Sequence, residues 1–167
     1  MKQWIFRNPG QFAPMRVCLA ILSAIALTLL VTAPAFAALG EDSSSVQTDM
    51  AHMQGSLRTT QTQAFTVHEI KAATGTTVRE YASPSGKIFA VAWQGPWLPN
   101  MRGLLASYFA QYEQALQTAV QSRSGRRPLV IEQPGLVVQS GGHMRSFAGR
   151  AYIPQMMPQG IRAEEIQ

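Results

Sequence analysis

The segment Thr76–Trp97, TTVREYASPSGKIFAVAWQGPW, indicates a β-hairpin that ends in a corner rich in tryptophan and proline. Its centre, Ser-Pro-Ser-Gly, is a strong turn signal. Pro84 presets φ at the second turn position, and Gly86 tolerates the exit conformation. Polar and apolar residues mix along the first arm, 77–82, as in a half-exposed strand. We therefore expect the rest of the chain to pack around this hairpin.

The second arm of the hairpin is apolar throughout. Every residue from Ile88 to Trp93 is apolar, which is typical of a strand covered on both faces. Strict alternation would place Phe89, Val91 and Trp93 on one face, with small alanines on the other. A domain with a single long helix leaves one sheet face short of cover, so a partner chain is one candidate for the second layer.

Residues 1–37 have the pattern of a cleaved signal peptide. Three basic residues precede a mostly apolar run over 17–31, and Ala35-Phe36-Ala37 fits a small-x-small cleavage site. The apolar run is shorter than the roughly 20 residues of a membrane span. An uncleaved membrane anchor is the alternative. We expect cleavage after Ala37, hence a periplasmic or otherwise exported protein with no transmembrane span.

Cleavage would change both the charge and the cysteine content of the chain. Removing 37 of the 167 residues leaves 130, takes away Cys18 and lowers the formal net charge from +5 to +2. A chain of that length forms about one domain. Without cysteine, disulfides and thiolate metal sites are excluded. Export and the low net charge argue against a nucleic-acid partner.

The chain before the hairpin combines a polar segment with a strand. Residues 38–63 begin polar and then space Val46, Met50, Met53 and Leu57 as one face of a short helix, with TTQTQ (59–63) as a connector. Alternation over 64–72 predicts a strand. Strands at 64–72, 76–82 and 87–93 would form an antiparallel meander.

A long amphipathic helix over 100–121 follows the meander, and Asn100 is its expected N-cap. A strand is predicted at 129–132. A second hairpin is predicted over 136–150, with its turn at Ser-Gly-Gly-His 140–143. The tail, 154–167, lacks periodicity and is expected to fray from Glu164 onward. We therefore predict one α+β domain over 64–153, an antiparallel sheet of five or six strands packed by one long helix.

Three separated blocks carry a family resemblance. They are VREYASPSGKIFAVAWQGP, PNMRGLLASYF and LVVQSGGHMRSFAGRAYIP. Together they resemble the exported bacterial family known as domain of unknown function 2844, over roughly residues 38–160. The resemblance implies export from Gram-negative cells. It brings no fold, catalytic residue, cofactor or ligand with it.

The sequence offers few candidates for chemistry. His68, Glu69, Glu80 and His143 are the material for acid–base or metal chemistry, but they lack metal-ligand spacing, so structural or solvated roles are expected. We predict no metal and no cofactor. The chain also lacks a nucleophile elbow, a P-loop and a dinucleotide-binding glycine motif.

Aromatic and basic residues are the candidates for contact with a partner. Trp93 is expected in the core, whereas Trp97, in a proline-flanked loop, is a contact candidate if it is exposed. Arg126, Arg127 and Arg145 are contact candidates that could bind an anionic envelope polymer, and His143 is a further contact candidate. For the arginines in general, a solvated cluster or pairing with glutamate is the simpler alternative.

These observations favour a non-enzymatic accessory or binding module of the cell envelope. Two alternatives stay open. One is a small envelope enzyme using His143 and Arg145, which would require a cleft with an acid and a second polar donor. The other is a carrier of an apolar ligand, whose cavity would be lined by Phe89, Val91, Leu105 and Phe109.

Overall fold

The computed structural model describes residues 39–122 and 128–167, and every structural statement below concerns these residues. They form an α+β domain, as predicted. Its elements, in chain order, are η1 (Ser43–Ser45), α2 (Val46–His52), β1 (Ser56–Gln61), β2 (Thr66–Lys71), β3 (Thr77–Ala82), β4 (Ile88–Gly95), α3 (Met101–Leu105), η2 (Ala106–Tyr108), α4 (Phe109–Ser122), β5 (Leu129–Gln133), β6 (Leu136–His143), β7 (Ser146–Tyr152), η3 (Pro154–Met156) and η4 (Ala163–Glu165).

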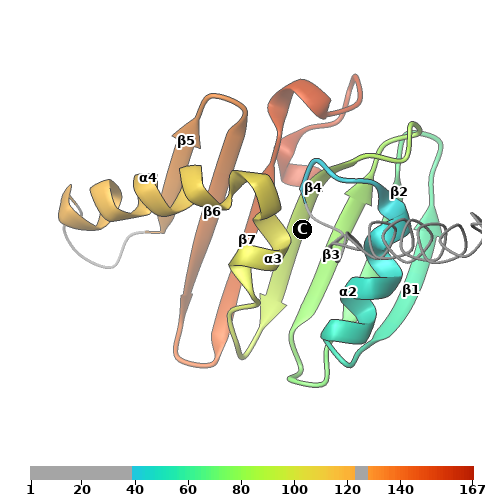
Figure 1. Cartoon of the computed structure of the whole chain (residues 1–167), viewed down its shortest axis with the longest axis horizontal. Helices are drawn as coiled ribbons and strands as arrows, with labels where there is room; N and C mark the ends of the chain where they lie inside the picture. The colour runs from blue at the N-terminus through green and yellow to red at the C-terminus, as the bar shows by residue number, and fades with distance from the viewer. Residues whose placement is uncertain (1–38, 123–127) are drawn as a thin grey trace, which may run out of the picture. The chain divides into compact units, whose positions relative to one another are not determined.

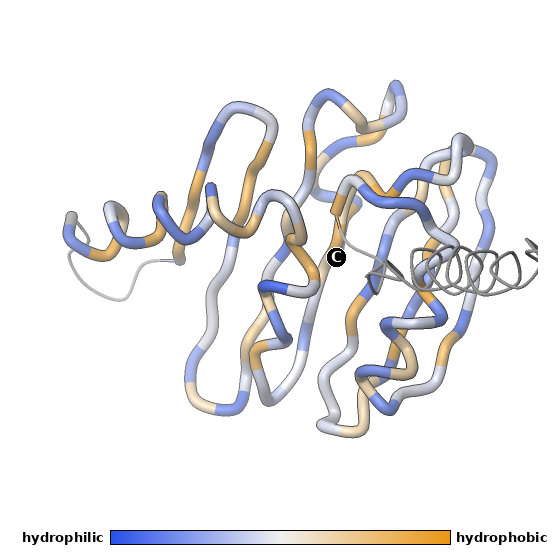
Figure 2. Tube along the Cα trace, viewed as in Figure 1, coloured by the Kyte–Doolittle hydropathy of each residue, from blue (hydrophilic) through white to orange (hydrophobic). Residues whose placement is uncertain are grey.

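One antiparallel sheet of seven strands runs through the domain in the order β1-β2-β3-β4-β7-β6-β5 (Figure 1). The predicted meander is present as β2, β3 and β4. The sheet has more than the predicted five or six strands, because residues 56–61 form the edge strand β1 instead of a helix end and a connector. Figure 2 shows the contrast between hydrophilic β1 and hydrophobic β4.

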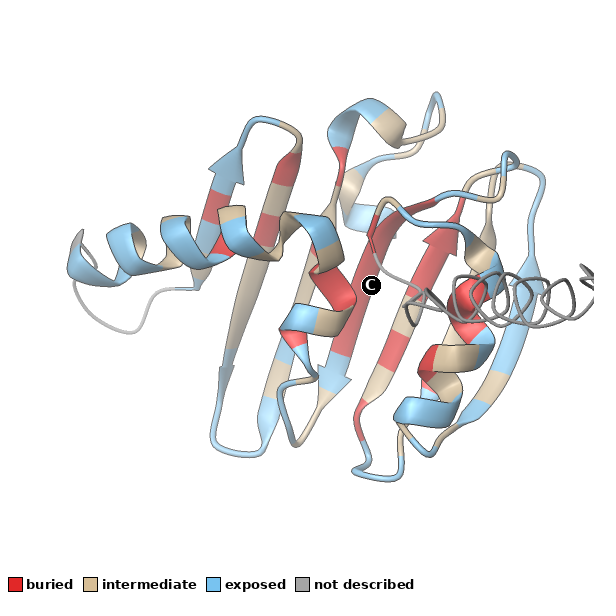
Figure 3. Ribbon diagram, in the orientation of Figure 1, coloured by how far each residue is buried: buried red, intermediate tan, exposed pale blue. Residues whose placement is uncertain are grey.

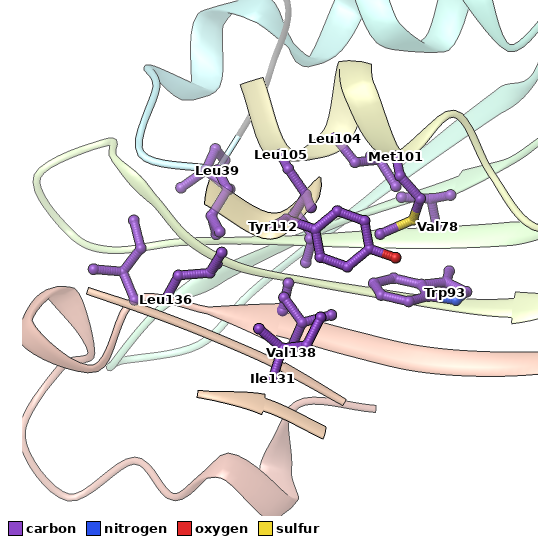
Figure 4. Close-up of a cluster of buried hydrophobic side chains, with 14 of the residues drawn as sticks. Leu39, Val78, Trp93, Met101, Leu104, Leu105, Tyr112, Ile131, Leu136 and Val138 are labelled. Carbon is purple, nitrogen blue, oxygen red and sulfur yellow. The ribbon is translucent and has the colours of Figure 1, made fainter. Parts of the chain in front are cut away.

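The helices α2, α3 and α4 cover one face of the sheet (Figure 1). Beneath them lies what we call the helix-side core, a group of buried residues from all three helices and from β2 to β7 (Figures 3 and 4). Trp93 belongs to this core and is 2% exposed, which confirms its predicted position. The ring lies over Gly149, where a Cβ would overlap it. Glycine at this position therefore makes room for the indole between β4 and β7.

A β-bulge changes the two faces of β4. Ala90 pairs with Tyr81 of β3, but Ile88 pairs with the next residue, Ala82, so Phe89 is an extra residue in β4. The predicted alternation is therefore wrong at this end of the strand. Phe89 faces away from the helices, and Ile88 lies in the helix-side core. An unpaired residue in one strand shifts every side chain beyond it to the opposite face.

The opposite face of the sheet carries a second apolar group, which we call the tail-side cluster. Its buried members are Tyr81, Phe89, Ala90, Ala92 and Ile166, with Phe65, Val67, Tyr152, Met156 and Met157 packed against them. The tail of the chain supplies three of these residues. Both faces of β4 are thus covered by the chain itself, which removes the reason, drawn from the sequence, for placing a partner over the sheet.

Hydrogen bonds fix the tail on this face, so the predicted fraying from Glu164 is wrong. The Tyr81 hydroxyl donates to the Gln167 carbonyl oxygen (2.8 Å) and accepts from the Gln167 amide (3.0 Å). Arg79 also donates to that carbonyl (3.0 Å). Arg150 donates to the carbonyl oxygens of Ala163 and Ile166. The sequence lacked periodicity here because the segment is held by side chains of the sheet, not by its own regular structure.

We expect Tyr81→Phe to loosen the tail. The change removes two hydrogen bonds to Gln167 and keeps the ring in the tail-side cluster, so the free energy of unfolding should fall by about 1–2 kcal/mol. Hydrogen exchange of the Ile166 amide should accelerate. Tyr152→Phe, on the same face but without a bond to Gln167, is the control. Equal exchange in both variants would contradict the anchoring role of Tyr81.

The predicted long helix over 100–121 is broken. Asn100 caps its start, as expected, by accepting a hydrogen bond from the Gly103 amide (3.3 Å). At Ala106, however, φ is +41°, a conformation that an L-residue adopts rarely and that ends a right-handed helix. The periodicity concealed this break, since α3 and α4 both direct apolar residues to the sheet.

The second hairpin turns later than predicted. Ser140 to His143 belong to β6, and Met144 and Arg145 form the turn. Arg145 takes the positive φ, +64°. The glycine pair 141–142 serves the strand instead: a Cβ on Gly142 would overlap the backbone of Ser146 and Phe147.

Candidate functional site

The corner after β4 presents two exposed apolar side chains on a fixed backbone. The Thr76 hydroxyl donates to the Trp97 carbonyl oxygen (2.8 Å), and the Trp97 amide approaches the same hydroxyl oxygen (3.3 Å). Thr76 itself is buried. Trp97 is nevertheless 56% exposed and Leu98 48% exposed. The predicted condition for Trp97 as a contact residue, exposure to solvent, is thus met.

A cavity of about 280 Å³ adjoins this corner. Three short segments surround it: the end of α2, the turn between β2 and β3, and the loop before α3. The lining residues are His52, Met53, Gln54, Ala72, Ala73, Thr74, Thr76, Val78, Trp97, Leu98, Pro99 and Asn100. The Ala73 amide donates to the Met53 carbonyl oxygen (3.3 Å), which ties α2 to the turn. We call this space the Trp97 cavity.

A pair of buried carboxyl groups lies behind α2. Glu80 of β3 is fully buried, and Asp49 of α2 is 5% exposed. The Asp49 carboxyl lies close enough to act on Glu80 through its charge and as a hydrogen-bonding group. Both carboxyl oxygens of Glu80 are buried, and neither has a hydrogen-bond donor among the described residues. A carboxylate can accept but not donate, so the contact between the two groups requires a proton.

The environment keeps this proton on the pair. Burial, followed by the charge and the hydrogen bond of Asp49, raises the pKa of Glu80 from 4.5 to about 9. Low-dielectric surroundings disfavour the charged form, and a neighbouring carboxylate disfavours it further. Glu80 is therefore protonated at neutral pH.

His68 lies next to this pair, directly opposite Glu80 in the register of β2 and β3. Its Nδ1 is 3.1 Å from the Thr59 hydroxyl oxygen, and partial burial lowers the pKa of the imidazole. Glu69 points to the other face, where it pairs with Arg79 at 2.6 Å. Of the four acid–base candidates, the structure thus brings together His68 and Glu80.

The other predicted contact residues lie away from the Trp97 cavity. His143 is exposed at the end of β6, and Arg145 is exposed in the following turn. Neither lines the cavity. Arg126 and Arg127 lie outside the described residues.

The residues named for an apolar carrier do not surround one space. Phe89 belongs to the tail-side cluster, whereas Val91, Leu105 and Phe109 belong to the helix-side core. Within residues 39–122 and 128–167, no group of three or more histidine, cysteine, aspartate or glutamate side chains could hold a metal ion. The described helices are also too short or too polar to cross a membrane.

A family model described as "Protein of unknown function (DUF2844)" matches residues 35–166. The chain belongs to this family. The match spans β1 to β7, α2 to α4 and nearly all of the tail, so the Trp97 cavity and the carboxyl pair both lie within the DUF2844 region. No curated protein and no solved structure matches the chain.

Asp49 was not predicted as a partner for Glu80. A signal was present: Asp49 occupies the same helical face as Val46, Met50 and Met53. Glu80 likewise shares one face of β3 with Val78 and Ala82, both buried in this DUF2844 domain. An acid on each of two facing apolar surfaces indicates a buried pair.

Proposed function

We propose that this DUF2844 chain is an exported, non-enzymatic binding module of the cell envelope and that it contacts an envelope protein through Trp97 and Leu98. The observation that carries the proposal is the pair of exposed apolar side chains beside the Trp97 cavity, on a backbone fixed by Thr76. Contact residues held rigid before binding lose little conformational entropy when a partner arrives. Tryptophan is also among the residues that contribute most to interface affinity.

The size of the cavity favours a protein partner over a free small molecule. Its volume, about 280 Å³, lies just below the roughly 300–1,000 Å³ of small-molecule sites. One or two apolar side chains of a partner segment would fill it, with the Trp97 ring and Leu98 packing against the rest of that segment.

The arrangement favours binding over catalysis. His143 and Arg145 are exposed on a hairpin, and the Glu80 carboxyl is buried beneath α2. Export rests on the N-terminal pattern of basic residues, an apolar run and Ala35-Phe36-Ala37.

Site-specific photo-crosslinking in the native cells tests this function. A photo-reactive phenylalanine analogue in place of Trp97 should give one discrete adduct with an envelope protein. The same analogue in place of Val130, which is 51% exposed on β5, should not give it. With the purified partner, Trp97→Ala should weaken binding at least tenfold, and Val130→Ala should leave it unchanged. Absence of an adduct at 97, or the same adducts at both positions, would overturn the proposal.

A further inference from the structure

Helix α2 depends on the sheet for its stability. It has seven residues, and helices of fewer than about 12 residues are marginal in water without tertiary packing. Met50 and Met53 pack against the helix-side core, and Val46 is buried in it. Asp49 lies among these apolar contacts and meets Glu80. The state of the carboxyl pair therefore bears directly on the attachment of the helix.

Among residues 39–122 and 128–167, the groups that face Glu80 provide no counter-charge. Asp49 faces it from α2, and His68 lies opposite on β2. On β4 the residue opposite is Val91, and the buried residues of α3 are apolar. Within the described part of the chain, Asp49 is the charged group that acts on Glu80. If both carboxyls ionise, two like charges are buried together.

We infer that a proton shared by Asp49 and Glu80 holds α2 against the sheet, and that loss of this proton releases α2 and removes one wall of the Trp97 cavity. His52 and Met53, at the end of α2, form that wall. Release lets both carboxyls reach water, where they ionise without this cost. The consequence for partner binding rests on the proposed function, but the release itself does not.

The pH range of the effect follows from proton linkage. In the attached state the pKa of Glu80 is about 9, so it keeps its proton up to about that pH. A solvated glutamate, with a pKa near 4.5, loses its proton at a much lower pH. Between these values the released state binds fewer protons, so a rise in pH favours release. The ratio of released to attached helix should grow by up to tenfold per pH unit.

Hydrogen exchange of the protein isolated from its native cells tests the inference without any partner. The reporters are three amides that depend on attached α2: Met53, bonded to the Asp49 carbonyl (2.9 Å), Gly55, bonded to Met50 (3.0 Å), and Ala73, bonded to Met53. Their protection factors, corrected for intrinsic exchange, should fall by up to tenfold per unit between pH 6.5 and 8.5. In this range the neutral form of His68 predominates, because burial lowers its pKa below the usual 6.5.

Two substitutions isolate the carboxyl pair. Glu80→Gln should make the three protection factors independent of pH, while Glu69→Gln, on the opposite face of the sheet, should keep the slope. Amides of α4 should show no slope in any variant. Flat protection factors in the unaltered protein, or the same slope in Glu80→Gln, would overturn the inference. Failure of the crosslinking at position 97 would overturn the proposed function alone, since exchange is measured without a partner.

Discussion

Glu80→Gln is expected to stabilise the protein at neutral and alkaline pH. At pH 7 the free energy of unfolding should rise by roughly 3 kcal/mol, which is the cost of holding a proton on Glu80 in the folded state. At pH 5 the gain should be below about 1 kcal/mol. Denaturant unfolding followed by circular dichroism at pH 5, 6, 7 and 8 measures both values.

The direction in which stability changes with pH depends on whether the folded or the unfolded state holds the proton. Below pH 4.5 the folded and unfolded states both hold it. Between 4.5 and about 9 the folded state holds it and the unfolded state does not, so the stability of the unaltered protein falls by about 1.4 kcal/mol per pH unit. Release of α2 would let Glu80 ionise in the otherwise folded protein. Above the pH at which the helix detaches, the free energy of unfolding should therefore fall less steeply with pH.

The matched control is Glu69→Gln. Glu69 lies one residue from the register partner of Glu80 but on the opposite face, in a partly exposed pair with Arg79. Its loss should cost no more than about 1 kcal/mol and should not change the slope with pH. If the free energy of unfolding changed with pH in the same way in Glu80→Gln and in the unaltered protein, the buried carboxyl would not hold the proton.

Trp93 and Trp97 should respond very differently to substitution by alanine. Trp93 is 2% exposed and lies over Gly149, so Trp93→Ala should lower the free energy of unfolding by about 3–5 kcal/mol. Trp97 is 56% exposed, and Trp97→Ala should change stability by less than about 1 kcal/mol. Unfolding followed by far-ultraviolet circular dichroism at pH 5.5 keeps Glu80 protonated and does not depend on tryptophan fluorescence.

Substitution of Trp93 also tests the energetic cost of burying its indole N–H without a hydrogen-bond acceptor. The Nε1 atom of Trp93 is buried without a hydrogen-bond acceptor among the described residues, which costs free energy. Trp93→Phe removes that donor and keeps most of the ring, so it should cost less than Trp93→Ala. A large loss for Trp97→Ala would contradict the assignment of Trp97 to the surface.

Much of the fold could be predicted because local patterns decided it. The turn around Pro84 and Gly86 and the apolar run 88–93 gave the central strands β3 and β4. Asn100 marked the start of α3. These features depend on neighbouring residues, which a sequence displays directly.

The errors arose where distant contacts override local patterns. Leu57 continues the helical spacing of Met50 and Met53, yet it lies in β1, since pairing with β2 outweighs that spacing. Likewise, neither the bulge at Phe89 nor the break at Ala106 is marked by a local pattern in the sequence. The tail has no periodic pattern of apolar residues, because the side chains that hold it, those of Tyr81 and Arg150, lie outside it in the sequence.

The candidate site was predictable only in part, because some of its features depend on neighbouring residues and others on contacts between distant segments. The position of Trp97 in a proline-flanked loop after a strand made it a contact candidate on condition of exposure, and the structure meets that condition. The cavity beside it could not be foreseen, because three separate segments build it. The pair of Asp49 and Glu80 joins a helix to a strand, and only the packing of α2 on the sheet brings them together.

The order of the strands also determines which contacts can form early when the chain folds. β1 to β4 and β5 to β7 are two meanders whose neighbouring strands are joined by short turns, and β4–β7 pairing unites them. That pairing must close the whole loop from Gly95 to Ser146, so it bears the entropy cost of a long-range contact. Trp93 and Gly149 meet at this junction. The indole that fills the core is thus also a large apolar contact at the junction between the two meanders.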